Sequence, residues 1–235
     1  MQKSVYILVC FSFVAGCSHL GMAANYTEPI NSLKDIRAAN PNIKDIDIRD
    51  LDAQYYPLLA KFAGLERIKI FGRQGTNATD DKLKTLGALH FPNLYYIDLN
   101  NNHLVTDSGI GAIAKLPRLS QLQLEGTAIT DQACHVFVQN MRLKVINLAN
   151  CTNVTRDGLM ELIKSPSLAE LRFSADTLTE KDVLAVLELL NKGVWVELVD
   201  TTGKLNVAKI KEIEERKHIH ALVRATGALQ DHRLR

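Results

Sequence analysis

A short apolar pattern recurs along most of the chain. Leucine-type residues hold the first, fourth and sixth positions of a six-residue unit, and the positions beside the fourth and sixth are mostly polar. This two-residue alternation is typical of a β-strand with one buried face, so each copy predicts a short strand. Successive clear copies start 22, 29, 25, 24 and 25 residues apart, which indicates a structural repeat. The copies are Ile43-Ile46-Ile48, Leu65-Ile68-Ile70, Leu94-Ile97-Leu99, Leu119-Leu122-Leu124, Leu143-Ile146-Leu148, Leu168-Leu171-Phe173 and a degenerate Gly193-Val196-Leu198.

A helical pattern follows the later strands. Its start is marked by a threonine, whose hydroxyl accepts a hydrogen bond from a first-turn N–H, and a nearby acidic residue suits the positive end of the helix dipole. Apolar residues then recur at helical spacing, as in Ile110-Ile113-Leu116. Each unit is therefore predicted to be strand, turn and helix. The expected helix starts are Thr106-Asp107, Thr130-Asp131, Thr155-Arg156-Asp157 and Thr179-Glu180.

One such unit cannot bury its own apolar face, but stacked copies can. We therefore expect an α/β solenoid of horseshoe shape, with parallel strands on the concave face and helices on the convex face. The alternative is an open doubly wound α/β domain, which also combines parallel strands with helices. Such a domain has less uniform strand spacing and usually carries a glycine fingerprint in its ligand loop, which this chain lacks.

These repeats resemble the leucine-rich repeat family. The copy from Leu143 to Leu159 (LKVINLANCTNVTRDGL) is similar to the cysteine-containing subtype, because the Leu, Cys, Thr-Asp and Gly-Leu landmarks are nearly all matched. Other copies carry Asn102, Thr127 or Thr177 near the cysteine position. The resemblance implies a leucine-rich-repeat solenoid that binds other proteins. Because F-box proteins carry similar repeats, a substrate-recognition protein of a ubiquitin ligase, or a host-directed effector, is an alternative function.

The ends of a solenoid need caps, because a terminal repeat would otherwise expose its core. We expect a helix in Ile30–Ala39 to close the N-terminal end. An amphipathic helix in Asn206–Lys217 and a last strand in His218–Val223 are expected at the other end. The expected divisions are residues 30–42 for the N-terminal cap, 43–203 for the repeats, and 204–235 for the C-terminal cap and tail.

The first residues have the pattern of an export signal. Lys3 precedes an apolar run from Val5 to Val14, which is too short to cross a bilayer as a helix. The Val-Ala-Gly-Cys string that ends at Cys17 resembles the lipobox of bacterial lipoproteins. A cut near Ala24 is the alternative, and it would give a soluble secreted protein.

The lipobox resemblance implies where the protein is held. It implies a signal peptide over residues 1–16, lipidation of Cys17 with acyl chains such as palmitate, and a tether over residues 17–29. Two or three acyl chains make a stable anchor where one does not. We therefore expect a lipoprotein of the bacterial cell envelope, in the inner or outer membrane.

Composition and the absence of known motifs narrow the function further. The 235 residues carry 28 Lys+Arg and 26 Asp+Glu, and a formal charge of +2 is too small to indicate binding to nucleic acid. GxSxG, HExxH, EF-hand and phosphate-loop patterns do not occur, so we expect a non-catalytic monomer without cofactor or metal. Cys134 and Cys151 fall at core positions of the repeat, where buried free thiols are favoured over a disulfide.

The repeat also predicts a candidate site. Side chains between positions four and six point away from the core, so they form an ordered row on the concave face. Aromatic side chains on or beside this row are candidate anchors. We expect an unidentified protein or peptide ligand to contact Lys69, Phe71, Tyr96, Asp98, Gln123, Asn147, Arg172, Trp195 and Glu197.

Two alternatives to this site stay open. A solenoid needs polar residues on its concave face simply to be soluble, whether or not it binds there. The long second repeat also carries the segment Phe71–Asp81 (FGRQGTNATDD), which is expected to bulge at one edge, where insertions often carry function.

Overall fold

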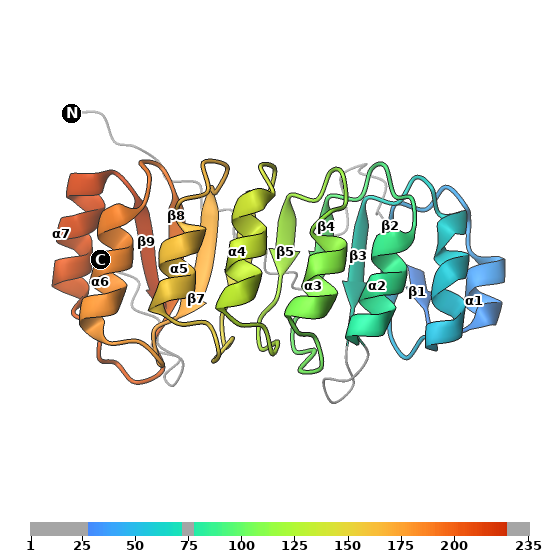
Figure 1. Cartoon of the computed structure of the whole chain (residues 1–235), viewed down its shortest axis with the longest axis horizontal. Coiled ribbons are helices and arrows are strands. Elements are labelled where there is room, and N and C mark those ends of the chain that lie inside the picture. Colours follow the sequence, from blue (N-terminus) through green and yellow to red (C-terminus); the bar gives the residue numbers. More distant parts are fainter. Residues whose placement is uncertain (1–27, 72–77, 225–235) are drawn as a thin grey trace, which may run out of the picture.

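The computed structural model describes residues 28–71 and 78–224. Within these residues, nine strands form one sheet, all neighbours are parallel, and the order along the sheet is the order along the chain (Figure 1). The strands are β1 Glu28–Ile30, β2 Asp45–Ile48, β3 Arg67–Ile70, β4 Tyr96–Asp98, β5 Gln121–Gln123, β6 Val145–Leu148, β7 Glu170–Ser174, β8 Trp195–Val199 and β9 His220–Arg224. The helices are α1 Leu33–Ala38, η1 Ala53–Lys61 (a 3-10 helix), α2 Asp80–Ala88, α3 Asp107–Ile113, α4 Asp131–Gln139, α5 Arg156–Leu162, α6 Glu180–Leu189 and α7 Val207–Lys217.

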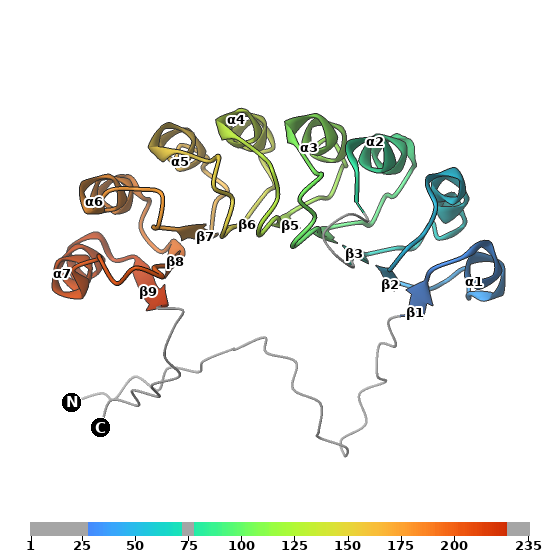
Figure 2. The ribbon, with the colours of Figure 1, turned by 90° about the horizontal axis from the view of Figure 1, so that it is seen from below.

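The molecule is a curved solenoid. Figure 2 shows the strands on the inner side of an arc and the helices on its outer side. Each strand-turn-helix unit returns the chain to the start of the next parallel strand. The predicted leucine-rich-repeat type of α/β solenoid is therefore confirmed.

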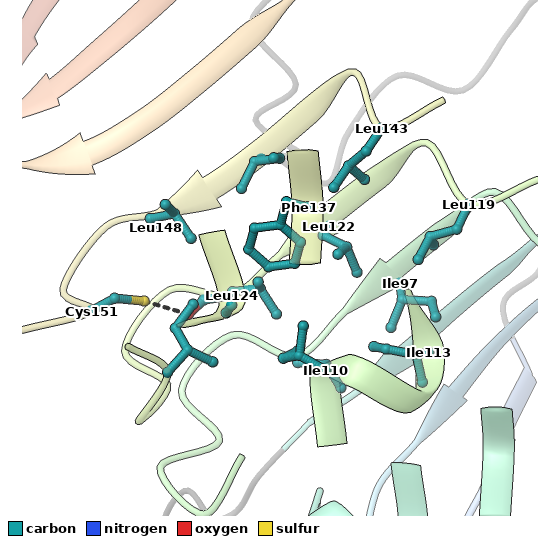
Figure 3. Close-up of a cluster of buried hydrophobic side chains, with 14 of the residues drawn as sticks. Ile97, Ile110, Ile113, Leu119, Leu122, Leu124, Phe137, Leu143, Leu148 and Cys151 are labelled. Atoms are coloured by element: carbon teal, nitrogen blue, oxygen red, sulfur yellow. Dashed lines mark hydrogen bonds between the residues drawn. The ribbon is translucent and has the colours of Figure 1, made fainter. Parts of the chain in front are cut away.

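The apolar positions of the repeat build the core. Register pairs stack the fourth-position residues across the sheet, so Ile97 lies beside Leu122 and Leu122 lies beside Ile146. These side chains are at most 1% exposed. Figure 3 shows Phe137 of α4 within the same apolar layer as Leu122 and Leu143. In the degenerate copy Gly193 supplies no side chain, and Val194 is buried next to it.

Threonine begins the helices where the sequence predicts it. Thr106, Thr130, Thr155 and Thr179 are N-caps whose hydroxyls accept a bond from a first-turn N–H. Thr79 does the same for α2. Each cap satisfies one of the donors that a helix start would otherwise leave without a partner.

The same threonines also join one repeat to the next. Asp107, the first residue of α3, accepts the backbone N–H and the hydroxyl of Thr130 at 2.9 and 2.6 Å. Asp80 holds Thr106 at 2.9 and 2.6 Å, and Asp131 holds Thr155 at 2.7 and 2.6 Å. We call these three pairs the Asp–Thr ladder. Each carboxylate fixes the start of the next helix and lies at the positive end of its own helix dipole.

The ladder changes chemistry after α5. The first residue of that helix is Arg156, and its Nε lies 3.4 Å from Asp182 Oδ1. Asp182 meanwhile closes a capping box with Thr179 in the first turn of α6. Between α5 and α6, Arg156 therefore stands where the earlier helices have an aspartate, and it contacts Asp182 instead of the N-cap threonine.

The turns after β2, β4, β5 and β6 also repeat. Asp50, Asn101, Gly126 and Asn150 occupy equivalent positions and all have positive φ. These are the residue types that tolerate the left-handed region best. The backbone therefore leaves each of these strands by the same route.

A buried polar residue closes the turn region. Asn102 Nδ2 donates to the carbonyls of Ile70 and Leu99 at 2.8 and 3.0 Å. Cys151 reaches an equivalent carbonyl, because its Sγ lies 3.0 Å from the Leu124 oxygen. Both Cys134 and Cys151 are free and buried, and burial raises the pKa of each thiol. The preference for free thiols is therefore confirmed.

The N-terminal cap differs from the prediction. Residues 28–30 form β1 beside β2, whereas the prediction placed residues 28 and 29 in the tether and began the helix at Ile30. The helix is shorter and starts after the N-cap Ser32. Ile30 is buried against the first repeat, and an edge strand tolerates Pro29, which lacks an N–H. At the other end, α7 and β9 confirm the predicted helix and last strand.

The Asp–Thr ladder predicts opposite effects for two glycines of α3. A Cβ on Gly109 would lie 2.5 Å from Asp80 Oδ1 and 3.1 Å from Asp80 Cα, and Thr106 holds that carboxylate in place. A Cβ on Gly111 would meet nothing within 4 Å. We expect Gly109→Ala to lower the free energy of unfolding by about 1–3 kcal/mol. Gly111→Ala should raise it by about 0.5–1 kcal/mol.

Urea unfolding followed by circular dichroism measures both variants. If Gly109→Ala proved as stable as Gly111→Ala, the close fit between α2 and α3 would be refuted.

Candidate functional site

The concave face consists of three rows of side chains that the strand register sets. The central row runs across β2–β8 in the predicted order, since Asp47 pairs with Lys69, Lys69 with Asp98, and so on along the sheet. One flanking row follows the same register and consists of Asp45, Arg67, Tyr96, Gln121, Val145, Glu170 and Trp195. The other lies just after the strands and consists of Arg49, Phe71, Asn100 and Glu125. The central row is Asp47, Lys69, Asp98, Gln123, Asn147, Arg172 and Glu197, and β9 adds Leu222.

A linked group lies at β2–β4. The Arg67 guanidinium lies 4.7 Å from the centroid of the Tyr96 ring, and its Nε is 3.9 Å from Asp45. The Tyr96 hydroxyl donates to Asp98 at 3.2 Å. Burial, followed by the charge of Asp98, raises the pKa of Tyr96, so Tyr96 stays protonated and can donate this bond. Tyr96 is therefore held in place by its neighbours.

Three carboxylates of this face favour the protonated form more than usual. Burial raises the pKa of Asp47, and Lys69 only partly opposes it. Burial also raises the pKa of Asp98, against the bond from the Asn100 N–H. Burial and the charge of Glu197 raise the pKa of Glu170. A cation brought next to any one of these carboxylates would lower the free energy of its charged form.

Asp47 is also short of a hydrogen-bond donor. Its Oδ1 is buried and has no hydrogen-bond partner among the described residues. An unpaired polar atom costs about 1–3 kcal/mol, so a donor from a ligand would stabilise it.

A charge network crosses β7–β9. Arg172 lies 3.2 Å from Glu197 and 3.8 Å from Glu125, and Arg224 lies 2.7 Å from Glu197. Arg172 Nε and Glu197 Oε1 are in ion-pair range, but their geometry is not that of a hydrogen bond. The sequence did not reveal Arg224 as a member, because only the register of β8 with β9 brings it beside Glu197. The network links Arg172, Glu197 and Arg224 of three successive strands with Glu125, which follows β5.

Two of the predicted contact residues offer little surface. Asn147 is 3% exposed and accepts the Ala149 N–H at 3.0 Å, while Glu197 is 8% exposed. Both side chains are therefore occupied by contacts within the protein and can offer a partner little surface. Gln123 and Lys69 are half-buried, and each presents part of its side chain.

Exposed rings stand toward the two ends of the face. Phe71 directly follows β3 and is 41% exposed, with the Arg49 guanidinium 5.7 Å from its ring centroid. Trp195 of β8 is also 41% exposed, and its ring centroid lies 5.5 Å from that of His220. Leu222 is similarly exposed in the central row. His220 and Leu222 were not predicted as parts of the face, although the expected strand over residues 218–223 contains both.

Some predictions fall outside the described residues. They are the signal peptide over residues 1–16, the lipidation of Cys17, most of the tether, and the middle of the Phe71–Asp81 insertion. No group of three or more His, Cys, Asp or Glu side chains suited to a metal occurs within residues 28–71 and 78–224. None of the helices in that part of the chain has the length and apolar character that a bilayer crossing requires.

The fold and its aligned concave face define a leucine-rich-repeat type of solenoid. No protein-family model matches the sequence. A curated relative is "Antagonist of mitotic exit network protein 1" from Eremothecium gossypii, which is 29% identical over 174 residues. The match covers 71% of this chain, which spans only 41% of the relative.

Solved structures also match this chain at low sequence identity. A chain in the crystal structure of the Rad7 and Elc1 complex in yeast superposes with a TM-score of 0.54 at 12% identity, over 83% of this chain and 62% of that one. An internalin from Listeria monocytogenes gives a TM-score of 0.44 at 12% identity, over 89% of this chain and 60% of that one.

Proposed function

We propose that this chain is a non-catalytic module that binds another protein on its concave face. The observation that carries the proposal is the register of the sheet, which brings charged and aromatic side chains of successive strands into continuous rows. The relative named as an antagonist of a network supports a regulatory binding role rather than catalysis.

The two exposed rings are the proposed anchors. Aromatic residues contribute most to binding where a partner covers them and excludes water. Phe71 and Trp195 each keep two fifths of their surface exposed, whereas Tyr96 is half-buried. A partner that spans β3 to β8 would cover both rings.

The partner is proposed to bring basic side chains to the carboxylates of the face. Asp47 and Asp98 flank Lys69, and Glu170 stands beside Trp195 in the register. A lysine or arginine of the partner beside these groups would restore their charged forms and supply the missing donor to Asp47.

A site-specific crosslink tests the docking face. A photoreactive amino acid at Gln123 should capture a defined partner in the native cell, and Trp195→Ala should reduce the yield about tenfold. The matched control places the photoreactive residue at His135, which is exposed on the convex helix α4. Equal capture from both positions, or capture from Gln123 that Trp195→Ala leaves unchanged, would contradict the proposal.

Arg172 is unsuitable for this test, because its substitution would unpair Glu125 and Glu197.

A second candidate is the F-box-like substrate-recognition protein. A relative from a eukaryote, named as an antagonist of a mitotic exit network, supports it over the bacterial lipoprotein, and a chain in the yeast Rad7 and Elc1 complex shares the fold. This chain spans less than two thirds of either protein. Copurification of a ubiquitin-ligase subunit with the tagged chain would support this candidate over the lipoprotein.

The lipid anchor at Cys17 is a separate proposal. The apolar run before Val-Ala-Gly-Cys supports it, while the eukaryotic relative gives it no support. The proposed location is the bacterial cell envelope, with a secreted form as the alternative. Labelled palmitate should enter the native chain and not the Cys17→Ala variant, whereas equal labelling of both would refute the anchor.

A further inference from the structure

A second surface feature lies at the edge of the sheet where the strands begin. Glu66, Tyr95, Ser120 and Lys144 directly precede β3, β4, β5 and β6, and they line a single open hollow of about 710 Å³. Arg118, Met141 and Arg142 complete most of its wall. Neighbouring strands lie about 4.8 Å apart, so the hollow extends roughly 14 Å across four repeats, the length of about four extended residues. We call it the edge groove.

The edge groove carries an excess of positive charge. Arg118, Arg142 and Lys144 have no ion-pair partner within the described part of the chain. The one acid in the wall, Glu66, is already paired with Lys44 at 2.6 Å. Three cations therefore meet in one hollow, in a chain whose total formal charge is only +2.

The loop that supplies two of these cations is fixed in position. The Arg142 guanidinium donates to the Pro117 carbonyl of the preceding repeat. Its backbone N–H donates to Asn140 Oδ1 at 3.0 Å, and Asn140 Nδ2 donates to the Ala114 carbonyl at 3.0 Å. A ligand that binds here would lose little free energy to ordering this loop.

The backbone at this edge is already paired. The Ser120 N–H donates to the Tyr95 carbonyl at 3.0 Å, and the Lys144 N–H donates to the Ser120 carbonyl at 2.8 Å. A ligand therefore cannot bind here by adding a strand, and side chains must hold it. Tyr95 is half-buried and Met141 is 65% exposed, so apolar surface lies beside the cations.

We propose that the edge groove binds an acidic segment of a protein partner, with successive Asp or Glu carboxylates facing Arg118 and Lys144. Bidentate and charge-assisted bonds favour carboxylates at such guanidinium and ammonium groups. Arg118 lies in the loop before β5, and Arg142 and Lys144 lie in the loop before β6. Because the positive charges are spread over two loops, they match carboxylates spaced along an extended peptide better than one compact anion. This inference adds to the proposed function, because a partner on the concave face would reach the groove over the starts of β4–β6.

Synthetic peptides test the groove without the natural partner. Fluorescence anisotropy measures binding of a labelled eight-residue peptide rich in Glu to the full chain, against the matching Gln peptide. We expect only the acidic peptide to bind, and binding should weaken strongly between about 50 and 300 mM salt. Arg118→Gln with Lys144→Gln should weaken it about tenfold. The control pair Lys181→Gln with Lys211→Gln, both exposed on convex helices, should leave it unchanged.

The possible outcomes separate the two proposals. Equal binding of the Gln peptide, or an equal loss in the control pair, would overturn the edge groove. Displacement of the peptide by millimolar inorganic phosphate would show a small-anion site instead, and would also overturn it. Trp195→Ala should leave peptide binding intact, so failure of the concave-face crosslink does not imply failure here.

Discussion

The alignment of successive repeats is the constraint on which the rest of the structure depends. A single strand-turn-helix unit cannot cover its apolar side, so stability comes from contacts between neighbours. Apolar stacking alone is non-directional, whereas the paired bonds from Asp107 to Thr130 have a fixed geometry. The Asp–Thr ladder therefore fixes where α3, α4 and α5 start, and the packing of the core between them follows from that position.

The functional surfaces are consequences of the same alignment. Strands held in register place the side chains of different repeats in rows, which makes a broad face from residues far apart in sequence. The starts of the strands come together at the edge, where Arg118 and Lys144 of successive loops share one groove. The two surfaces favour ligands of opposite charge. Burial raises the pKa of Asp47, Asp98 and Glu170 on the face, whereas Arg118, Arg142 and Lys144 line the groove. A partner of mixed charge would satisfy both.

The sequence predicts the repeat, the threonine caps and the concave row because each depends on local spacing. It does not predict the part that Asp107 plays across repeats, because a first-turn acid is equally well explained by the helix dipole alone. The burial of Asn147 and the pairing of Arg224 with Glu197 also escape it, since both depend on neighbouring strands. The edge groove combines residues of four loops that no motif links. The strand β1 was missed because three residues carry no periodic signal.

A double-mutant cycle between Asp107 and Thr130 tests the central claim most directly. Urea unfolding of the native chain, Asp107→Ala, Thr130→Val and the double variant gives the coupling free energy of this pair. A charge-assisted bond between repeats predicts a coupling of about 1–2 kcal/mol. A coupling within about 0.3 kcal/mol of zero would contradict the account, because the two residues would then stabilise their own helices independently.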